Sequence, residues 1–250
     1  MVVIWGLDLH DLQWSKFKSS YMFGNRDYHL RRTKFVVYQI AMILCVVSES
    51  VGTAALSNYV DQQDEIEMLH SSAHVHNDNF VGIAAYNIFV GIAVATIFGA
   101  AFFFDLFFPT RYEPMNIRWA WRISAVVVSI MALGDAIAFT VIVATGKAWI
   151  SADSADQLAI AQEAIDPPLR YRDNAKAIVS LVLLWVGWVA TVASTCIMFA
   201  FYQHVGKYGP LSHGARWRQG ADDGGKPPLT SQQLAAAQRT NGTQMRENRV

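Results

Sequence analysis

Cysteine and charge are both scarce in this sequence of 250 residues. The chain has two cysteines, Cys45 and Cys196, and both lie inside apolar runs, which excludes a disulfide-braced scaffold. Charged residues make up 16% of the chain, whereas soluble domains carry about 25%. The formal net charge is zero, so we expect no nucleic-acid partner held by bulk charge. Because 53% of the residues are hydrophobic, the composition indicates an integral membrane protein whose first partner is the lipid bilayer.

The motifs of common enzymes and cofactor sites are also missing. The sequence has neither the phosphate loop G-x-x-x-x-G-K-[ST] nor the nucleophile motif G-x-S-x-G. No histidine lies in a long apolar run, which excludes a haem held by two histidines inside a bundle. We therefore expect a protein that is not an enzyme and has no cofactor.

Four long apolar runs are the main feature that the sequence does contain, at about residues 35–57, 80–104, 121–145 and 177–202. A helix of roughly 20 residues crosses a hydrocarbon core, and lipid requires each span to satisfy its own backbone hydrogen bonds. The sequence thus predicts an all-α membrane protein with a four-transmembrane-helix bundle at residues 35–203. Residues 1–34 are expected to lie partly at the membrane interface, and residues 204–250 to form a mostly disordered tail.

The distribution of Lys and Arg predicts the orientation of the spans. Residues 1–34, the link between the second and third spans together with the start of the third span, and the tail hold sixteen of the 20 Lys and Arg residues. The loop after the first span holds none. Basic residues concentrate on the cytosolic side, so both termini are predicted to be cytosolic. The plasma membrane or an endomembrane is the expected location.

Three polar residues are predicted to share one layer inside the membrane. Glu49 and Asp135 each lie 14 residues into a span, which places them about 21 Å from the cytosolic end. Asn87 lies about 10 Å below the other surface. Two interpretations remain open. Either the three residues join helices through hydrogen bonds, or they form a proton or cation site.

Two further features are expected to hold the helices together. Asp105 and Arg122 lie at the cytosolic ends of neighbouring spans, where we predict a structural ion pair. Gly91, Ala95 and Gly99 form a stripe of small residues that permits close helix packing, either with another span or with another copy of the chain.

The two predicted outer loops carry weaker signals. His70, His74 and His76 lie in the first loop, where a histidine pair four residues apart on a helix is a candidate metal site. A solvated loop without metal is the favoured interpretation, because no HExxH motif or loop cysteine accompanies these histidines. The second loop is predicted to contain a short amphipathic helix within residues 154–165.

By its topology the chain resembles the MARVEL-type four-span proteins over about residues 31–205. The tetraspanin, claudin and connexin patterns fail because their outer-loop cysteines are absent. The MARVEL resemblance implies a role in organising membrane domains or partner proteins, which include other membrane proteins or further copies of this chain. It rests on topology and assigns no functional residue. The alternative is a small proton or cation transporter, channel or accessory subunit that uses Glu49 and Asp135.

Overall fold

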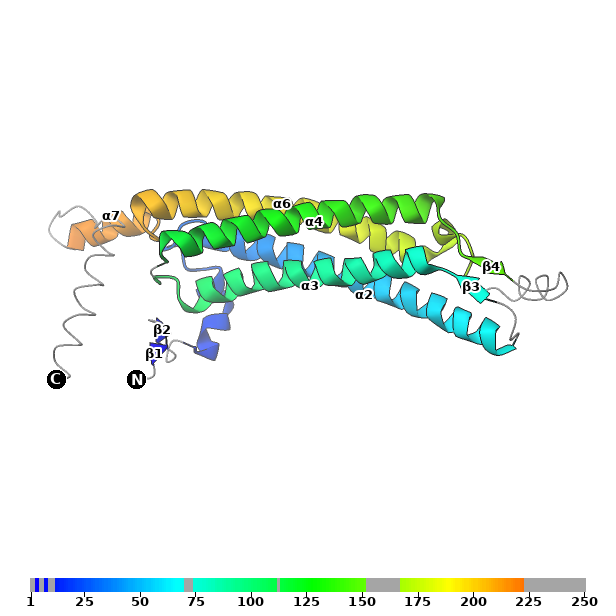
Figure 1. Cartoon of the computed structure of the whole chain (residues 1–250). Coiled ribbons are helices and arrows are strands. Elements are labelled where there is room, and N and C mark those ends of the chain that lie inside the picture. The colour runs from blue at the N-terminus through cyan, green and yellow to red at the C-terminus, as the bar shows by residue number, and fades with distance from the viewer. Residues whose placement is uncertain are drawn as a thin grey trace, which may run out of the picture. The chain divides into compact units, whose positions relative to one another are not determined.

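The computed structural model describes residues 3–4, 7–8, 12–69, 74–111, 113–151 and 167–222, which are mostly helical (Figure 1). The long helices are α2 (Arg31–Leu69), α3 (Asp78–Phe107), α4 (Met115–Thr145) and α6 (Ala175–Tyr208). The short helical elements are η2 (Trp14–Phe17), α1 (Ser19–Met22), η3 (Tyr171–Asp173) and α7 (His213–Asp222). The strands are β1 (Val3–Ile4), β2 (Leu7–Asp8), β3 (His74–His76) and β4 (Trp149–Ser151).

In the part of the chain that the structure describes, four helices are long and apolar enough to cross a membrane. They are α2, α3, α4 and α6, and each of the four predicted spans lies within one of them. The protein is therefore an integral multi-pass membrane protein. Helix α2 has 39 residues and a length of about 58 Å, which exceeds a hydrocarbon core of about 30 Å. Part of α2 must project from the membrane.

The chain divides into two compact units, and each long helix contributes residues to both. Unit 1 comprises Met1–Tyr38, Ala100–Ser124 and Ala193–Val250. Unit 2 comprises Gln39–Gly99 and Ala125–Val192. Both ends of the described chain belong to unit 1.

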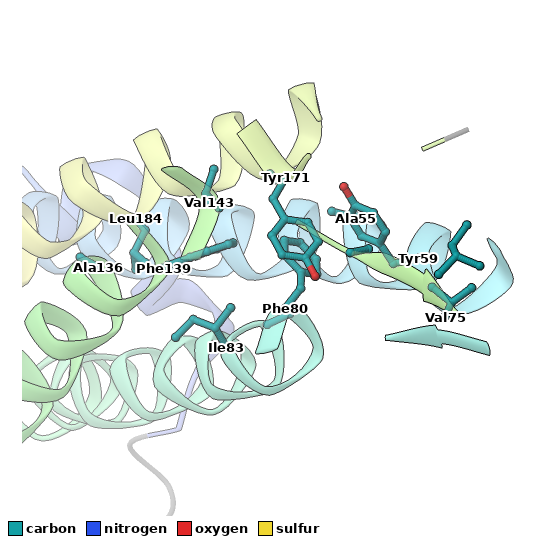
Figure 2. Packing of buried hydrophobic residues seen from close by; sticks show 14 of the residues in the cluster. Ala55, Tyr59, Val75, Phe80, Ile83, Ala136, Phe139, Val143, Tyr171 and Leu184 are labelled. Atoms are coloured by element: carbon teal, nitrogen blue, oxygen red, sulfur yellow. The ribbon is translucent and has the colours of Figure 1, made fainter. Parts of the chain in front are cut away.

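Unit 2 has an aromatic and aliphatic core. Tyr59 of α2, Phe80 of α3 and Tyr171 of η3 are fully buried, and the centroids of their rings lie 4.8–5.3 Å apart. Phe139 of α4 packs edge-on against Phe80 (Figure 2). Such clusters contribute beyond the area that they bury, because the edge of one ring faces the negatively charged face of another. Leu184 of α6 belongs to the same cluster, so the core joins all four long helices within unit 2.

A two-stranded sheet connects the two segments that the sequence predicts as outer loops. Strands β3 and β4 are antiparallel, with Val75 opposite Ile150. Both of these side chains are buried. Much of the first predicted loop is helical as well, since α2 runs to Leu69. The expectation of a solvated loop throughout residues 58–79 is therefore wrong. The amphipathic helix predicted within residues 154–165 lies outside the described residues.

Unit 1 contains structure in both segments that flank the bundle. Tyr28 forms an antiparallel bridge with Leu211. Ser212 begins α7, because its hydroxyl accepts a hydrogen bond from the Ala215 N–H at 3.3 Å. Helix α6 continues to Tyr208. Residues 204–222 thus form ordered secondary structure where the composition predicts disorder, and the rest of the predicted tail lies outside the described residues.

Candidate functional site

A reciprocal pair of serines joins α2 to α6 inside unit 2. The Ser48 hydroxyl donates to the Ser180 carbonyl at 2.8 Å, and the Ser180 hydroxyl donates to the Ser48 carbonyl at 2.8 Å. Both residues are fully buried. Because each hydroxyl bonds the backbone of the other helix, the pair specifies the register of the two helices.

Asn87 lies beside this serine pair but forms none of its bonds. A Cβ built on Gly52 would lie 3.0 Å from Asn87 Nδ2 and 3.0 Å from Ser180 Oγ, so α2, α3 and α6 meet here. Asn87 is 1% exposed, and neither atom of its side-chain amide has a hydrogen-bond partner in the described part of the chain. Asn87 therefore has unused hydrogen-bonding capacity inside the bundle.

Asp135 and Glu49 have different surroundings, although both lie in unit 2. Asp135 is fully buried, and among the described residues neither of its carboxylate oxygens has a hydrogen-bond partner. Glu49 is half-buried, and its carboxylate lies against the position that a Cβ on Gly91 would take.

Glu49, Asn87 and Asp135 thus all belong to unit 2, but the hydrogen bonds expected of Asn87 and Asp135 are not found among the described residues. Other side chains of unit 2 form hydrogen bonds between helices. Besides the serine pair, Trp185 Nε1 of α6 donates to Thr140 Oγ1 of α4 at 3.0 Å. The sequence does not predict the role of Ser48, because a serine in an apolar run does not indicate which residue it bonds.

Asp105 has partners other than the predicted one. Its carboxylate forms one ion pair with Lys34 of α2. It forms a second with Arg111, whose Nη1 lies 3.3 Å from Asp105 Oδ1. Arg111 also pairs with Glu113 at 2.5 Å. Burial alone lowers the pKa of Arg111, but the charges of Asp105 and Glu113 outweigh burial and raise it. The network joins the start of α2 to the end of α3 and to the link that follows α3.

Arg122 is surrounded by aromatic rings in place of an acid. Its guanidinium carbon lies 5.1 Å from the ring centroid of Trp119, 5.6 Å from Phe199 and 5.4 Å from Tyr202. In the described residues no ion pair joins it to Asp105, so the predicted pairing is corrected. Lys34 of α2 pairs with Asp105 instead. The prediction chose Arg122 because α4 follows α3 in the sequence.

The stripe of small residues on α3 faces α2 within unit 2. A Cβ on Gly91 would meet Glu49, and one on Gly99 would lie 3.3 Å from Met42 Cε. Ala95, between them, is half-buried. Of the two partners left open by the sequence, these glycines contact another span of the same chain.

Two of the three predicted histidines, His74 and His76, lie in unit 2. His74 Nδ1 is 3.5 Å from the Glu67 carboxylate, and the His76 ring stacks on Trp149 with centroids 3.8 Å apart. Both histidines belong to β3, and His70 lies outside the described residues. Across the ranges that the structure describes, no group of three metal-ligating side chains occurs. Stacking accounts for His76 without a metal.

Direct hydrogen bonds hold this end of unit 2 together. Tyr59 donates to the Pro168 carbonyl at 3.0 Å, and Gln62 donates to the Pro167 carbonyl at 3.0 Å. Tyr171 donates to Asn79 Oδ1 at 2.9 Å, and burial, then Tyr59 and Asp78, raise the pKa of Tyr171. We call residues 59–69, 74–76, 149–151 and 167–174 the cap.

No protein-family model, curated protein or solved structure matches the chain.

Proposed function

We propose that this protein is a non-enzymatic organiser of membrane domains or partner proteins. In this proposal a four-helix anchor holds both termini in the cytosol and presents the cap on the other side of the plasma membrane or of an endomembrane. The bias of Lys and Arg toward the segments of unit 1 supports this orientation. The role is the one that the topological resemblance to MARVEL-type proteins implies.

The observation that carries the proposal is the cap. The projecting part of α2 is fastened by Tyr59 and Gln62 to the segment before η3. This arrangement leaves an acidic face exposed, formed by Asp61, Asp64 and Glu65. A rigid, charged surface on a membrane anchor suits recognition of a basic partner, because its charge steers association and its geometry needs little ordering.

Charge reversal on this face provides the test. The triple variant Asp61→Lys, Asp64→Lys, Glu65→Lys should disperse the protein from its membrane clusters and raise its lateral mobility in cells. All three side chains are exposed, so the melting temperature of the purified variant should stay close to that of the wild type.

Asp173→Lys is the matched control, since Asp173 is 54% exposed and belongs to the cap but not to the acidic face. It should leave clustering and mobility unchanged. Unchanged clustering in the triple variant would contradict the proposal.

A second candidate function has its own observation. Asp135 and Asn87 are buried polar side chains that lack hydrogen-bond partners in the described residues, and intramembrane acids commonly serve proton or cation pathways. Transport predicts that liposomes with the purified protein conduct protons or Na⁺ and that Asp135→Asn abolishes the flux without loss of folding. Equal flux through wild-type and empty liposomes would exclude this function.

A further inference from the structure

Glu49 is an acidic residue at the surface of unit 2, at a depth where lipid surrounds the helix. It lies 14 residues into the first predicted span, about 21 Å along a hydrocarbon core of about 30 Å. About 9 Å of hydrocarbon remains to the far surface, which is further than its short side chain reaches. Asp135 is sealed inside unit 2 with both oxygens covered, whereas Glu49 is half-buried and its carboxyl reaches the surface of the bundle.

The Glu49 carboxyl has no hydrogen-bond or ion-pair partner among the described residues. It lies against Gly91 of α3, which has no side chain that could bind it. The neighbouring Ser50 hydroxyl donates to the carbonyl of Val46 on its own helix, at 2.8 Å. A carboxyl in hydrocarbon is costly unless another group binds it. The position therefore favours binding of a group from another molecule.

The surface of α2 beside Glu49 suits close packing of another helix. Between residues 50 and 57 every exposed side chain of α2 is small. These side chains recur every three or four residues along one side of the helix, and we call them the small-residue face: Ser50, Thr53, Ala54 and Ser57. Small residues let two helix backbones approach closely in a membrane. The exposed side of α4 carries branched residues instead, among them Ile123, Ile130 and Ile137.

The complementary group is a cation that this chain does not carry at the right depth. Arg122 is the one Lys, Arg or His within the four predicted spans, and it is the second residue of its span, far from the level of Glu49. A second copy docked symmetrically on the same face would bring two Glu49 carboxyls together, and like charges disfavour that contact. Charge complementarity therefore favours a Lys or Arg on a transmembrane helix of another protein.

We propose that Glu49 and the small-residue face form a docking site for a transmembrane helix of another protein that carries a Lys or Arg at the same depth. The cationic side chain pairs with the Glu49 carboxyl, and the small residues allow the two backbones to pack closely. This site lies within the membrane-spanning part of α2, so it is separate from the cap and does not depend on the acidic face.

Binding of synthetic helices to the full chain in neutral detergent micelles, measured by resonance energy transfer, tests the proposal. The probe is a transmembrane peptide of Leu and Ala. One version carries a single Lys about 9 Å from one end of its apolar core, a second has Leu at that position, and a third carries the Lys at the end of the core. The first peptide should bind about 5–30-fold more tightly than the other two, the range that one interhelical hydrogen bond supplies in model peptides.

Glu49→Gln should lose most of this preference, because it removes the charge with little change of shape. Asp135→Asn is the matched control, since it neutralises an acid of the same unit that is sealed away from any docking helix. It should keep the preference. The triple variant of the acidic face should also bind the peptides as the wild type does, so a failure of this site and a failure of the proposed function can be told apart.

Three results would overturn the proposal: equal affinity for the first two peptides, an undiminished preference in Glu49→Gln, or self-association of the chain that Glu49→Gln abolishes. The last result would identify a second copy as the occupant. If Glu49→Gln does not fold, Ala54→Ile replaces it. Ala54 is exposed, so isoleucine there keeps Glu49 and fills the small-residue face. The Lys peptide should then bind more weakly, and undiminished binding would also refute the docking site.

Discussion

Replacing Gly52 by alanine probes the point where three helices of unit 2 meet. The added Cβ would lie 3.0 Å from Asn87 Nδ2 and 3.0 Å from Ser180 Oγ. No hydrogen bond among the described residues holds the Asn87 amide, whereas Ser180 Oγ is held by its 2.8 Å hydrogen bond to the Ser48 carbonyl. We therefore expect Gly52→Ala to destabilise the bundle by displacing Ser180.

Three contributions determine the size of the effect. Crowding in a packed interior costs about 1–3 kcal/mol. Each hydrogen bond of the serine pair that lengthens adds about 0.6 kcal/mol. Alanine in place of glycine favours the helix by roughly 0.5–1 kcal/mol. The balance is a loss of about 1–3 kcal/mol for Gly52→Ala.

Gly134→Ala on α4 is the matched control, because a Cβ there meets nothing within 4 Å. It receives the same gain in helix propensity without the crowding, so it should be neutral or slightly stabilising. The difference between the two variants isolates the steric cost at Gly52, about 1–3 kcal/mol.

Reversible unfolding in mixed micelles with a rising fraction of dodecyl sulfate, followed by circular dichroism, provides the free energies. Ser180→Ala removes the hydroxyl that the new methyl group would strike, so the double variant should lose less stability than the two single losses added together. Strict additivity, or a Gly52→Ala protein as stable as Gly134→Ala, would refute the packing described around Gly52.

Other perturbations address unit 1 and the orientation. Asp105→Asn should destabilise the protein by about 3–5 kcal/mol, because it leaves the buried Lys34 without its acid, while Arg111 keeps its ion pair with Glu113. Arg122→Gln should cost less in the same unfolding assay, and equal losses would contradict the pairing of Asp105 with Lys34 and Arg111. The pKa of His29 is lowered in the folded state, so the unfolded chain binds more protons and stability falls as the pH drops through the unfolded value near 6.5. Melting curves between pH 7.5 and pH 5.5, values of about one unit on either side of that pKa, should accordingly show a smaller decline for His29→Gln, and an identical decline would exclude His29 as a contributor. In a Cys196→Ser background, an impermeant maleimide should label Asp64→Cys but not Arg218→Cys in intact cells, and the reverse pattern would invert the proposed topology.

Properties that belong to one helix at a time were predictable from the sequence. Lipid requires about 20 apolar residues in a helix, so the four spans follow from composition alone, and each lies inside α2, α3, α4 or α6. The glycine stripe on α3 was also apparent, because Gly91 and Gly99 recur at helical spacing. The sequence left open which helix the stripe faces, and the contacts with Glu49 and Met42 identify α2.

The ends of the helices were less predictable, because local signals outside lipid are weaker. Helix α2 continues past the predicted end at residue 57 to Leu69, since Tyr59, Gln62 and Ile66 keep a buried face at helical spacing. Helix α7 follows Gly209 and Pro210, where composition indicated disorder. Its start depends on Ser212, which bonds the Arg26 carbonyl at 2.8 Å, a contact 186 residues away in the chain.

The sequence by itself determined that this chain crosses the membrane and which segments do so, because the bilayer acts on each span separately. Only the tertiary structure decided which polar groups meet. It pairs Asp105 with Lys34, bonds Ser48 to Ser180, and leaves Asp135 and the guanidinium of Arg31 without hydrogen bonds in the described residues. Such pairings depend on how each helix is rotated and which helix lies beside it. Rotation and neighbours are set by the packing of all the helices together, so the position of a residue along its own helix does not reveal its partner.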